Sequence, residues 1–165
     1  MPRRDDLESI MVLGSGPIKI GQAAEFDFSG SQAVRALRED GYKVILVNSN
    51  PATIQNDPEM ADVVYIEPLL PDTIAKILEK ERPCALLAGM GGQTALNIAS
   101  ELSHNGTLER LGVELIGSDL DAIDKAEDRE LFNQVCESIN LPISQAVACN
   151  SIDEVIAAAE LIGSW

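Results

Sequence analysis

The chain has 165 residues, 45% of them hydrophobic, and its 27 acidic against 12 basic residues give a formal net charge of −15. This size and composition suffice for one domain with an ordinary hydrophobic core. The excess of acids repels nucleic-acid phosphates and anionic lipids, so we expect no nucleic acid and no membrane among the partners.

Apolar runs and helical patterns alternate along the whole chain. This alternation is typical of a parallel sheet with helices on its faces, so we expect an α/β, Rossmann-like open parallel sheet. The apolar runs are too short to cross a bilayer and the N-terminus lacks the apolar core of a secretory signal, which favours a cytoplasmic protein. The five predicted strands cover residues 10–14, 43–48, 63–66, 84–88 and 113–117.

The first predicted strand runs into the segment Gly14-Ser-Gly-Pro-Ile-Lys-Ile-Gly21, which we call the first corner. A glycine-rich turn between a strand and a helix lets backbone N–H groups come close to a ligand or to another backbone. A dinucleotide fingerprint would have its third glycine where Lys19 stands. It would also have an acid at the end of the second strand, about 20 residues further on, where this chain has Asn48. These departures argue against NAD binding, and a Rossmann dehydrogenase is kept only as an alternative.

A helix is predicted over residues 22–40, with Gly41 in the position that ends a helix. The loop over residues 48–58, after the second strand, is polar and contains two prolines, which interrupts regular structure. We expect Asn48 and Asn50 to form turns there, because Asn side chains bond to backbone two residues further on.

A second glycine-rich turn, Gly89-Met-Gly-Gly-Gln-Thr94, follows the fourth predicted strand, and we call it the second corner. A predicted helix that begins at Pro71 and stops at Arg82-Pro83 precedes that strand, and another helix follows the turn. Because ligands of open α/β sheets collect at the carboxyl ends of the strands, two such corners indicate one ligand crevice. The alternative is that the glycines only let the strands turn tightly into helices.

Beyond the fifth strand the sequence predicts helices over residues 120–125 and 127–140. A short strand over 143–148 and a last helix from Ser151 follow. Ser151 and Glu154 have the spacing of a capping box.

Cysteine and histidine usage argues against several kinds of site. The single histidine, His104, lies in a polar stretch near a predicted helix end, where we expect it to be exposed, which excludes a multi-histidine metal site and a well-buried Ser/His/Asp triad. The cysteines are odd in number and widely spaced, which favours small buried side chains over a disulfide, a metal site or a nucleophile. They are Cys84, Cys136 and Cys149.

Three segments carry a resemblance to a known family. They are GSGPIKIGQAAEFDFSGSQAVRALREDGYKVILVNSNPATIQNDPEMADVVYIEP, MGGQTALN and DAIDKAEDRELF. Together they resemble the start of the large subunit of carbamoyl phosphate synthetase, from Ile10 to about Leu141. NSNPATI and MGGQTALN are similar to the first half of that subunit, which phosphorylates bicarbonate, rather than the second half, which phosphorylates carbamate.

The resemblance implies a pre-ATP-grasp domain over residues 1–118 and, over 119–165, linker helices and the start of a truncated ATP-grasp domain. It implies a ligase that makes carbamoyl phosphate from bicarbonate, ammonia and two ATP for arginine and pyrimidine biosynthesis. A small glutaminase subunit would supply the ammonia from glutamine within a larger hetero-oligomer. Mg²⁺ or Mn²⁺ would serve as cofactor with ligands downstream of this chain, so we expect no catalytic residue here and no activity from the isolated chain.

The resemblance also implies a nucleotide-contacting residue. Ala126-Glu-Asp-Arg129 matches the AEDR segment of the family, which assigns ATP binding to Arg129. A guanidinium stays charged and can bond two phosphate oxygens at once. Judged from the residues alone, Arg129 could instead pair with Glu127 or Asp128.

The two corners would form one wall of the chamber in which bicarbonate is phosphorylated, and would keep water from the reactive carboxyphosphate. Glu25 and Asp27 could orient ammonia or hold the loop through backbone N–H groups, although a helix N-terminus favours acids by itself. Lys19 could contact an anion or be solvated. The candidate chamber residues are Gly14, Gly16, Lys19, Glu25, Gly91 and Gly92.

Two further alternatives remain. The chain could be the pre-ATP-grasp domain of another carboxylate-amine ligase, or it could be a non-catalytic subunit-docking module.

Overall fold

The computed structural model describes residues 3–16, 24–144, 147 and 149–162. The chain divides into two compact units, Met1–Ile123 and Asp124–Trp165. Between residues 22 and 40 the described helix is Ala24–Glu39 (α1), and residues 22 and 23 lie outside the described part.

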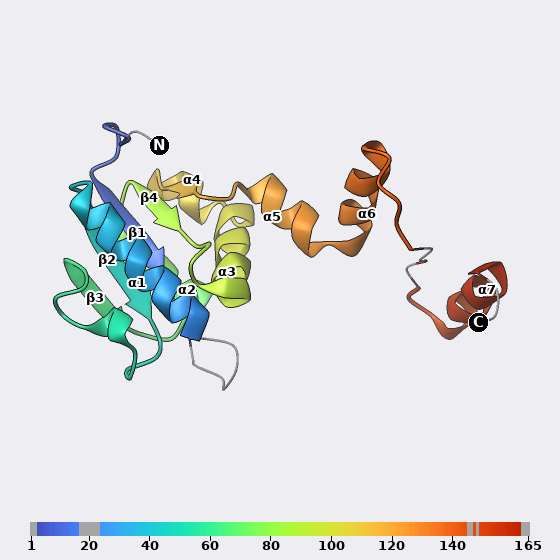
Figure 1. Ribbon diagram of the computed structural model, residues 1–165, viewed down its shortest axis with the longest axis horizontal. Helices are drawn as coiled ribbons and strands as arrows, with labels where there is room; N and C mark the ends of the chain where they lie inside the picture. The colour runs from blue at the N-terminus through green and yellow to red at the C-terminus, as the bar shows by residue number, and fades with distance from the viewer. Residues whose placement is uncertain (1–2, 17–23, 145–146, 148, 163–165) are drawn as a thin grey trace. The chain divides into compact units, whose positions relative to one another are not determined.

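The first unit contains a five-stranded parallel sheet with the order β3-β2-β1-β4-β5 (Figure 1). β1 is central: Ile10 lies opposite Val44 on one side and Ala85 on the other. The predicted α/β class and open parallel sheet are confirmed, and each strand end lies within a residue or two of its prediction. The strands are Ser9–Leu13 (β1), Lys43–Asn48 (β2), Val63–Ile66 (β3), Ala85–Leu87 (β4) and Glu114–Ile116 (β5).

Both faces of the sheet are covered by helices. Met11 and Ile45 point to the face that packs against α2 (Pro71–Glu81), α3 (Gly92–His104) and α4 (Thr107–Leu111). Their neighbours Val12 and Val44 point to the opposite face, where Val34 of α1 packs. Because successive residues of a strand alternate between faces, strands buried on both sides have continuous apolar sequences, as β1 and β2 do.

Helix α1 ends as predicted at Gly41. The Gly41 N–H donates to the Arg38 carbonyl at 2.9 Å and the Tyr42 N–H donates to the Leu37 carbonyl at 3.1 Å. With Gly41 at φ +84°, this is a Schellman ending that satisfies the last carbonyls of the helix. His104 is exposed at the last residue of α3, as expected.

Two short elements were not predicted. Residues Ile54–Asn56 form a 3₁₀ turn (η1) inside the polar loop after β2, and α4 lies between Gly106 and Gly112. Both are too short to show a helical repeat of apolar residues.

The second unit contains α6 (Arg129–Ser138) and α7 (Ile152–Ile162), while α5 (Leu120–Glu127) begins in the first unit. The Ser151 hydroxyl accepts from the Glu154 N–H at 3.3 Å, which confirms the predicted cap. The Glu154 carboxylate accepts from the Asn150 N–H rather than from that of Ser151. Ile143, Ser144 and Val147 belong to no strand, and the rest of the predicted strand over 143–148 lies outside the described residues.

The three cysteines are free. Cys136 is buried as expected, whereas Cys84 and Cys149 are half-buried. Among the described residues, none of the helices combines the length and the apolar content that crossing a bilayer requires.

Glu81 at the end of α2 links this helix to two strands. The Tyr65 hydroxyl donates to Glu81 Oε1 at 2.6 Å, and Lys43 Nζ lies 3.5 Å from Oε2. The Tyr65 hydrogen bond and the Lys43 charge lower the pKa of Glu81 below its ordinary value of 4.5, against the opposing effect of burial. A carboxylate with a lowered pKa stabilises the fold above the unfolded pKa, and that contribution is lost as the pH falls through the folded pKa.

We therefore expect Glu81→Gln to lower the free energy of unfolding by about 1–2 kcal/mol at neutral pH, because a charge-assisted hydrogen bond is lost. The difference from the unsubstituted chain should shrink as the pH falls below 4.5. Urea unfolding over a pH series measures it, and Tyr65→Phe should reduce the same pH dependence. A difference that stays constant down to about pH 3 would contradict the assignment.

Candidate functional site

The structure places the described start of the first corner, residues 14–16, beside the second corner. The first follows β1 and the second follows β4, and these strands are neighbours with the same direction. The chain leaves β1 for β2 and β3 on one side and then crosses to β4 on the other. The carboxyl ends of β1 and β4 therefore flank the topological switch point, where open α/β sheets bind ligands.

Gly91 of the second corner packs directly on the backbone of the first. A Cβ atom at Gly91 would lie 2.5 Å from the Gly14 carbonyl oxygen and 2.8 Å from that of Leu13. A Cβ atom at Gly92 would lie 3.4 Å from the ring of Phe26, which belongs to the first turn of α1. The two interpretations of the glycines, as the border of a ligand crevice and as tight turns from strand to helix, are therefore compatible. The tight turns themselves bring the two corners together.

Asn48, at the end of β2, forms a hydrogen bond to the backbone of the first corner. Its side chain is fully buried, and its Oδ1 accepts from the N–H of Gly16 at 3.0 Å and of Asn50 at 3.4 Å. Asn50 Oδ1 in turn accepts from the Ala52 N–H at 3.0 Å. The predicted turn-forming role of both asparagines is confirmed, and the bond from Asn48 to the first corner is an addition that the sequence did not predict.

Gln55 of η1 is a second buried amide at this site, and the sequence did not predict it. Its Nε2 donates to the carbonyls of Phe26 and Asp27 at 3.1 Å each, and its Oε1 accepts from Asn48 Nδ2 at 3.3 Å. The side chain has no exposed surface. A polar residue in a polar loop carries no sequence signal of burial, so only the structure reveals it.

The two acids of α1 differ in their surroundings. Asp27 Oδ1 accepts from the Thr53 hydroxyl, so Asp27 ties α1 to the loop after β2 through a side chain and not through the predicted backbone N–H groups. Glu25 is exposed in the first turn of the helix. Lys19 lies outside the described residues.

Arg129 is the first residue of α6, in the second unit, and it is exposed. One of the two acids that could pair with it, Asp128, caps α6 instead, since its Oδ1 accepts from the Leu131 N–H at 2.9 Å. Among the described residues, no group of three or more His, Cys, Asp or Glu side chains is arranged to hold a metal ion.

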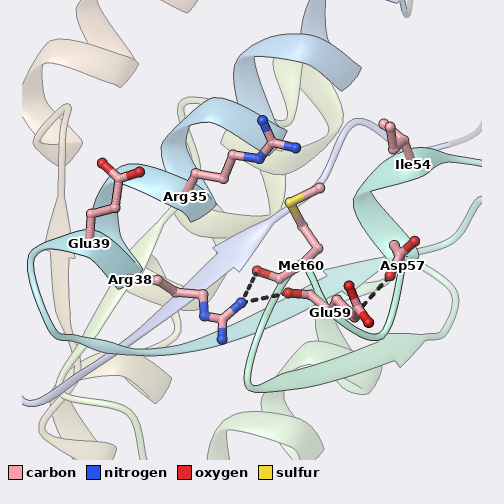
Figure 2. A pocket seen from close by; sticks show the side chains of 7 residues that line it. All are labelled: Arg35, Arg38, Glu39, Ile54, Asp57, Glu59 and Met60. Carbon is pink, nitrogen blue, oxygen red and sulfur yellow. Dashed lines mark hydrogen bonds between the residues drawn. The ribbon is translucent and has the colours of Figure 1, made fainter.

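A groove of about 670 Å³ lies between the C-terminal half of α1 and the loop after η1 (Figure 2). Figure 2 shows Arg38 reaching across to the carbonyl oxygens of Glu59 and Met60. Its lining contains neither corner, so we place the functional site at the switch point and not in this groove. The lining residues are Arg35, Arg38, Glu39, Ile54, Asp57, Glu59 and Met60.

Comparison with known proteins gives consistent relatives. Residues 6–125 match the family model of the carbamoyl phosphate synthase preATP-grasp domain. The chain is 59% identical over 163 residues to the "carbamoyl phosphate synthase large chain, N-terminal section" of Aquifex aeolicus, covering 99% of this chain and 29% of that protein. It is 60% identical to the carbamoyl phosphate synthase large chain of Neisseria meningitidis serogroup A, covering 99% of this chain and 15% of that protein. The chain therefore spans less than a third of the length of either relative.

Solved structures with the same fold are more distant in sequence. The biotin carboxylase domain of Hydrogenobacter thermophilus 2-oxoglutarate carboxylase, in complex with MgADP, ADP and bicarbonate, superposes with a TM-score of 0.67 at 17% identity, over 96% of this chain and 34% of that one. The biotin carboxylase subunit of a pyruvate carboxylase gives a TM-score of 0.60 at 19% identity, over 96% of this chain and 34% of that one. At such identities the likeness shows the fold alone.

Proposed function

Because the chain belongs to the carbamoyl phosphate synthase large-chain family, through its pre-ATP-grasp domain, we propose that it lines the bicarbonate-phosphorylating half-site of such a synthetase. The synthetase forms carbamoyl phosphate from bicarbonate, ammonia and two ATP. One ATP phosphorylates bicarbonate to carboxyphosphate, ammonia displaces phosphate to give carbamate, and the second ATP phosphorylates the carbamate. The observation that carries the proposal is the packing of the two corners at the switch point of a chain 60% identical to a known large chain.

In this proposal the domain forms one wall of the reaction chamber and keeps solvent out of it. Carboxyphosphate is a mixed anhydride that water hydrolyses, so a chamber that holds it must exclude solvent. Gly91 lets the second corner approach the Gly14 and Leu13 carbonyl oxygens without an intervening side chain. Gly14 and Gly16 leave room for side chains behind the first corner, and Gly92 leaves room for the ring of Phe26. Glu25, exposed in the first turn of α1, would orient ammonia or hold the corner loop.

The remaining machinery belongs to other parts of the synthetase. Residues 119–165 would be the linker helices and the start of the ATP-grasp domain, where Arg129 binds an ATP phosphate. Residues downstream of this chain would hold the Mg²⁺ or Mn²⁺, as the resemblance to the family implies. A glutaminase subunit in a cytoplasmic hetero-oligomer would supply ammonia, serving arginine and pyrimidine biosynthesis.

A chimera tests the proposal. This chain would replace the matching 163 residues of the Neisseria meningitidis large chain, and carbamoyl phosphate formation would be measured with ammonia and with glutamine plus a glutaminase subunit. We expect synthesis by the chimera and none by the isolated chain, which should also lack bicarbonate-stimulated ATP hydrolysis. A folded chimera without synthesis, beside an active parent enzyme, would contradict the proposal.

A further inference from the structure

Asn48 and Gln55 form a buried amide pair behind the first corner. Each side chain is fully buried, and the two are joined by the 3.3 Å bond from Asn48 Nδ2 to Gln55 Oε1. Neither has a place in the predicted chemistry of the half-site. Buried amides cost free energy unless their hydrogen bonds are made, so their partners indicate their role.

The partners lie on both flanks of residues 17–23. Asn48 Oδ1 accepts from the Gly16 N–H on the N-terminal flank. Gln55 Nε2 donates to the Phe26 and Asp27 carbonyls on the C-terminal flank, within the first turn of α1. The pair therefore sets the spacing between the described end of the first corner and the start of α1.

Two glycines leave the space that the Gln55 side chain occupies. A Cβ atom at Gly14 would lie 2.7 Å from Gln55 Oε1, and one at Gly30 would lie 2.5 Å from Gln55 Nε2. Phe26 links this spacing to the second corner, because its carbonyl accepts from Gln55 Nε2 and its ring lies beside Gly92.

We propose that Asn48 and Gln55 are positioning residues that hold Gly16, at the end of the described part of the first corner, and the start of α1 at the spacing required to keep water out of the half-site. The inference rests on the proposed function. Its physical basis is that Gly91 lies directly on the Gly14 and Leu13 carbonyl oxygens, with no side chain between them to fill a gap, so a small change in spacing admits solvent. Misplacement of about 1 Å is sufficient for a large loss of catalytic rate.

The number of ATP molecules hydrolysed per carbamoyl phosphate formed distinguishes a positioning role from a role in folding. In the chimera, the ATP hydrolysed per carbamoyl phosphate formed should rise about two- to tenfold in Gln55→Leu and in Asn48→Leu, because carboxyphosphate is lost to water. If a substitution only unfolds a fraction of the enzyme molecules, the rates of ATP hydrolysis and of carbamoyl phosphate formation fall together. The ATP hydrolysed per carbamoyl phosphate formed then stays unchanged. An unchanged ratio in both variants would overturn the proposal.

Ser31→Ala is the matched control. The Ser31 hydroxyl donates to the same Asp27 carbonyl at 2.8 Å, and the side chain is buried, but it makes this bond within α1 and joins no other segment. We expect Ser31→Ala to leave the ratio as it is in the unsubstituted chimera. An equal rise in the control would also overturn the proposal, because it would show a general effect of weakening α1.

A second measurement applies where a variant folds poorly in the chimera. In the 165-residue chain, amide hydrogen exchange at Gly16 should accelerate in Asn48→Leu while exchange along β1 stays slow. Unchanged protection of Gly16 would contradict the anchoring role. If the unsubstituted chimera makes no carbamoyl phosphate, the proposed function fails, whereas normal coupling of both leucine variants in an active chimera refutes the positioning role alone.

Discussion

Replacing Gly91 by alanine is expected to lower the free energy of unfolding of the first unit by about 2–4 kcal/mol. The added methyl group would lie 2.4 Å from Ala95 Cβ and 2.5 and 2.8 Å from the carbonyl oxygens of Gly14 and Leu13, and none of these atoms can rotate away. Gly91 has φ −103°, which alanine adopts readily, so the expected loss is steric and not conformational. Urea unfolding followed by far-ultraviolet circular dichroism measures it.

Gly89→Ala is the control for this prediction. Gly89 belongs to the same turn, but a Cβ atom there would meet nothing within 4 Å. We expect a change within about 0.5 kcal/mol, as is usual for open positions. Equal losses in both variants would show that the turn tolerates no side chain at all, and that the contact between the corners is not the cause.

Replacing Arg129 by alanine is expected to reduce kcat/KM for ATP in the chimera by roughly 100-fold, because a charge-assisted bond to a phosphate oxygen would be lost. Arg129 is exposed at the start of α6, and its neighbour Asp128 caps the helix, so the substitution should leave the fold intact. Steady-state kinetics of bicarbonate-dependent ATP hydrolysis measures the effect.

Arg35→Ala controls for the loss of one positive charge. Arg35 is an exposed arginine of α1 beside the groove, remote in the sequence from the AEDR segment (Figure 2). We expect its substitution to change kcat/KM by less than about twofold. Equal kinetics for the two variants would refute the assignment of ATP binding to Arg129.

The strands and long helices could be predicted because burial imposes a repeating pattern on the sequence. β1 and β2 are buried on both faces and read as continuous apolar runs, and α2 shows apolar residues at Ile74, Ile77 and Leu78 between a proline and a left-handed Arg82. The end of α1 followed from the single residue Gly41. These signals are local, so they need no knowledge of the rest of the fold.

The site was predictable only in part. The position of both corners on one edge follows from the rule for parallel sheets, and the structure confirms it. The amide pair could not be anticipated, because Gln55 meets Phe26 and Asp27 through a turn of the chain that leaves no periodicity. The role of Thr53 as the partner of Asp27 was missed for the same reason.

Because β1 is the central strand of the sheet, the order of synthesis on the ribosome determines when each of its two edges can pair. β1 pairs with β2 early, but its other edge stays open until Ala85–Leu87 has been synthesised. Until then, a nascent chain presents an unpaired strand edge, and the first corner lacks the backbone partner supplied by Gly91. Slow translation before residue 85 should therefore prolong the period in which a chaperone is most needed.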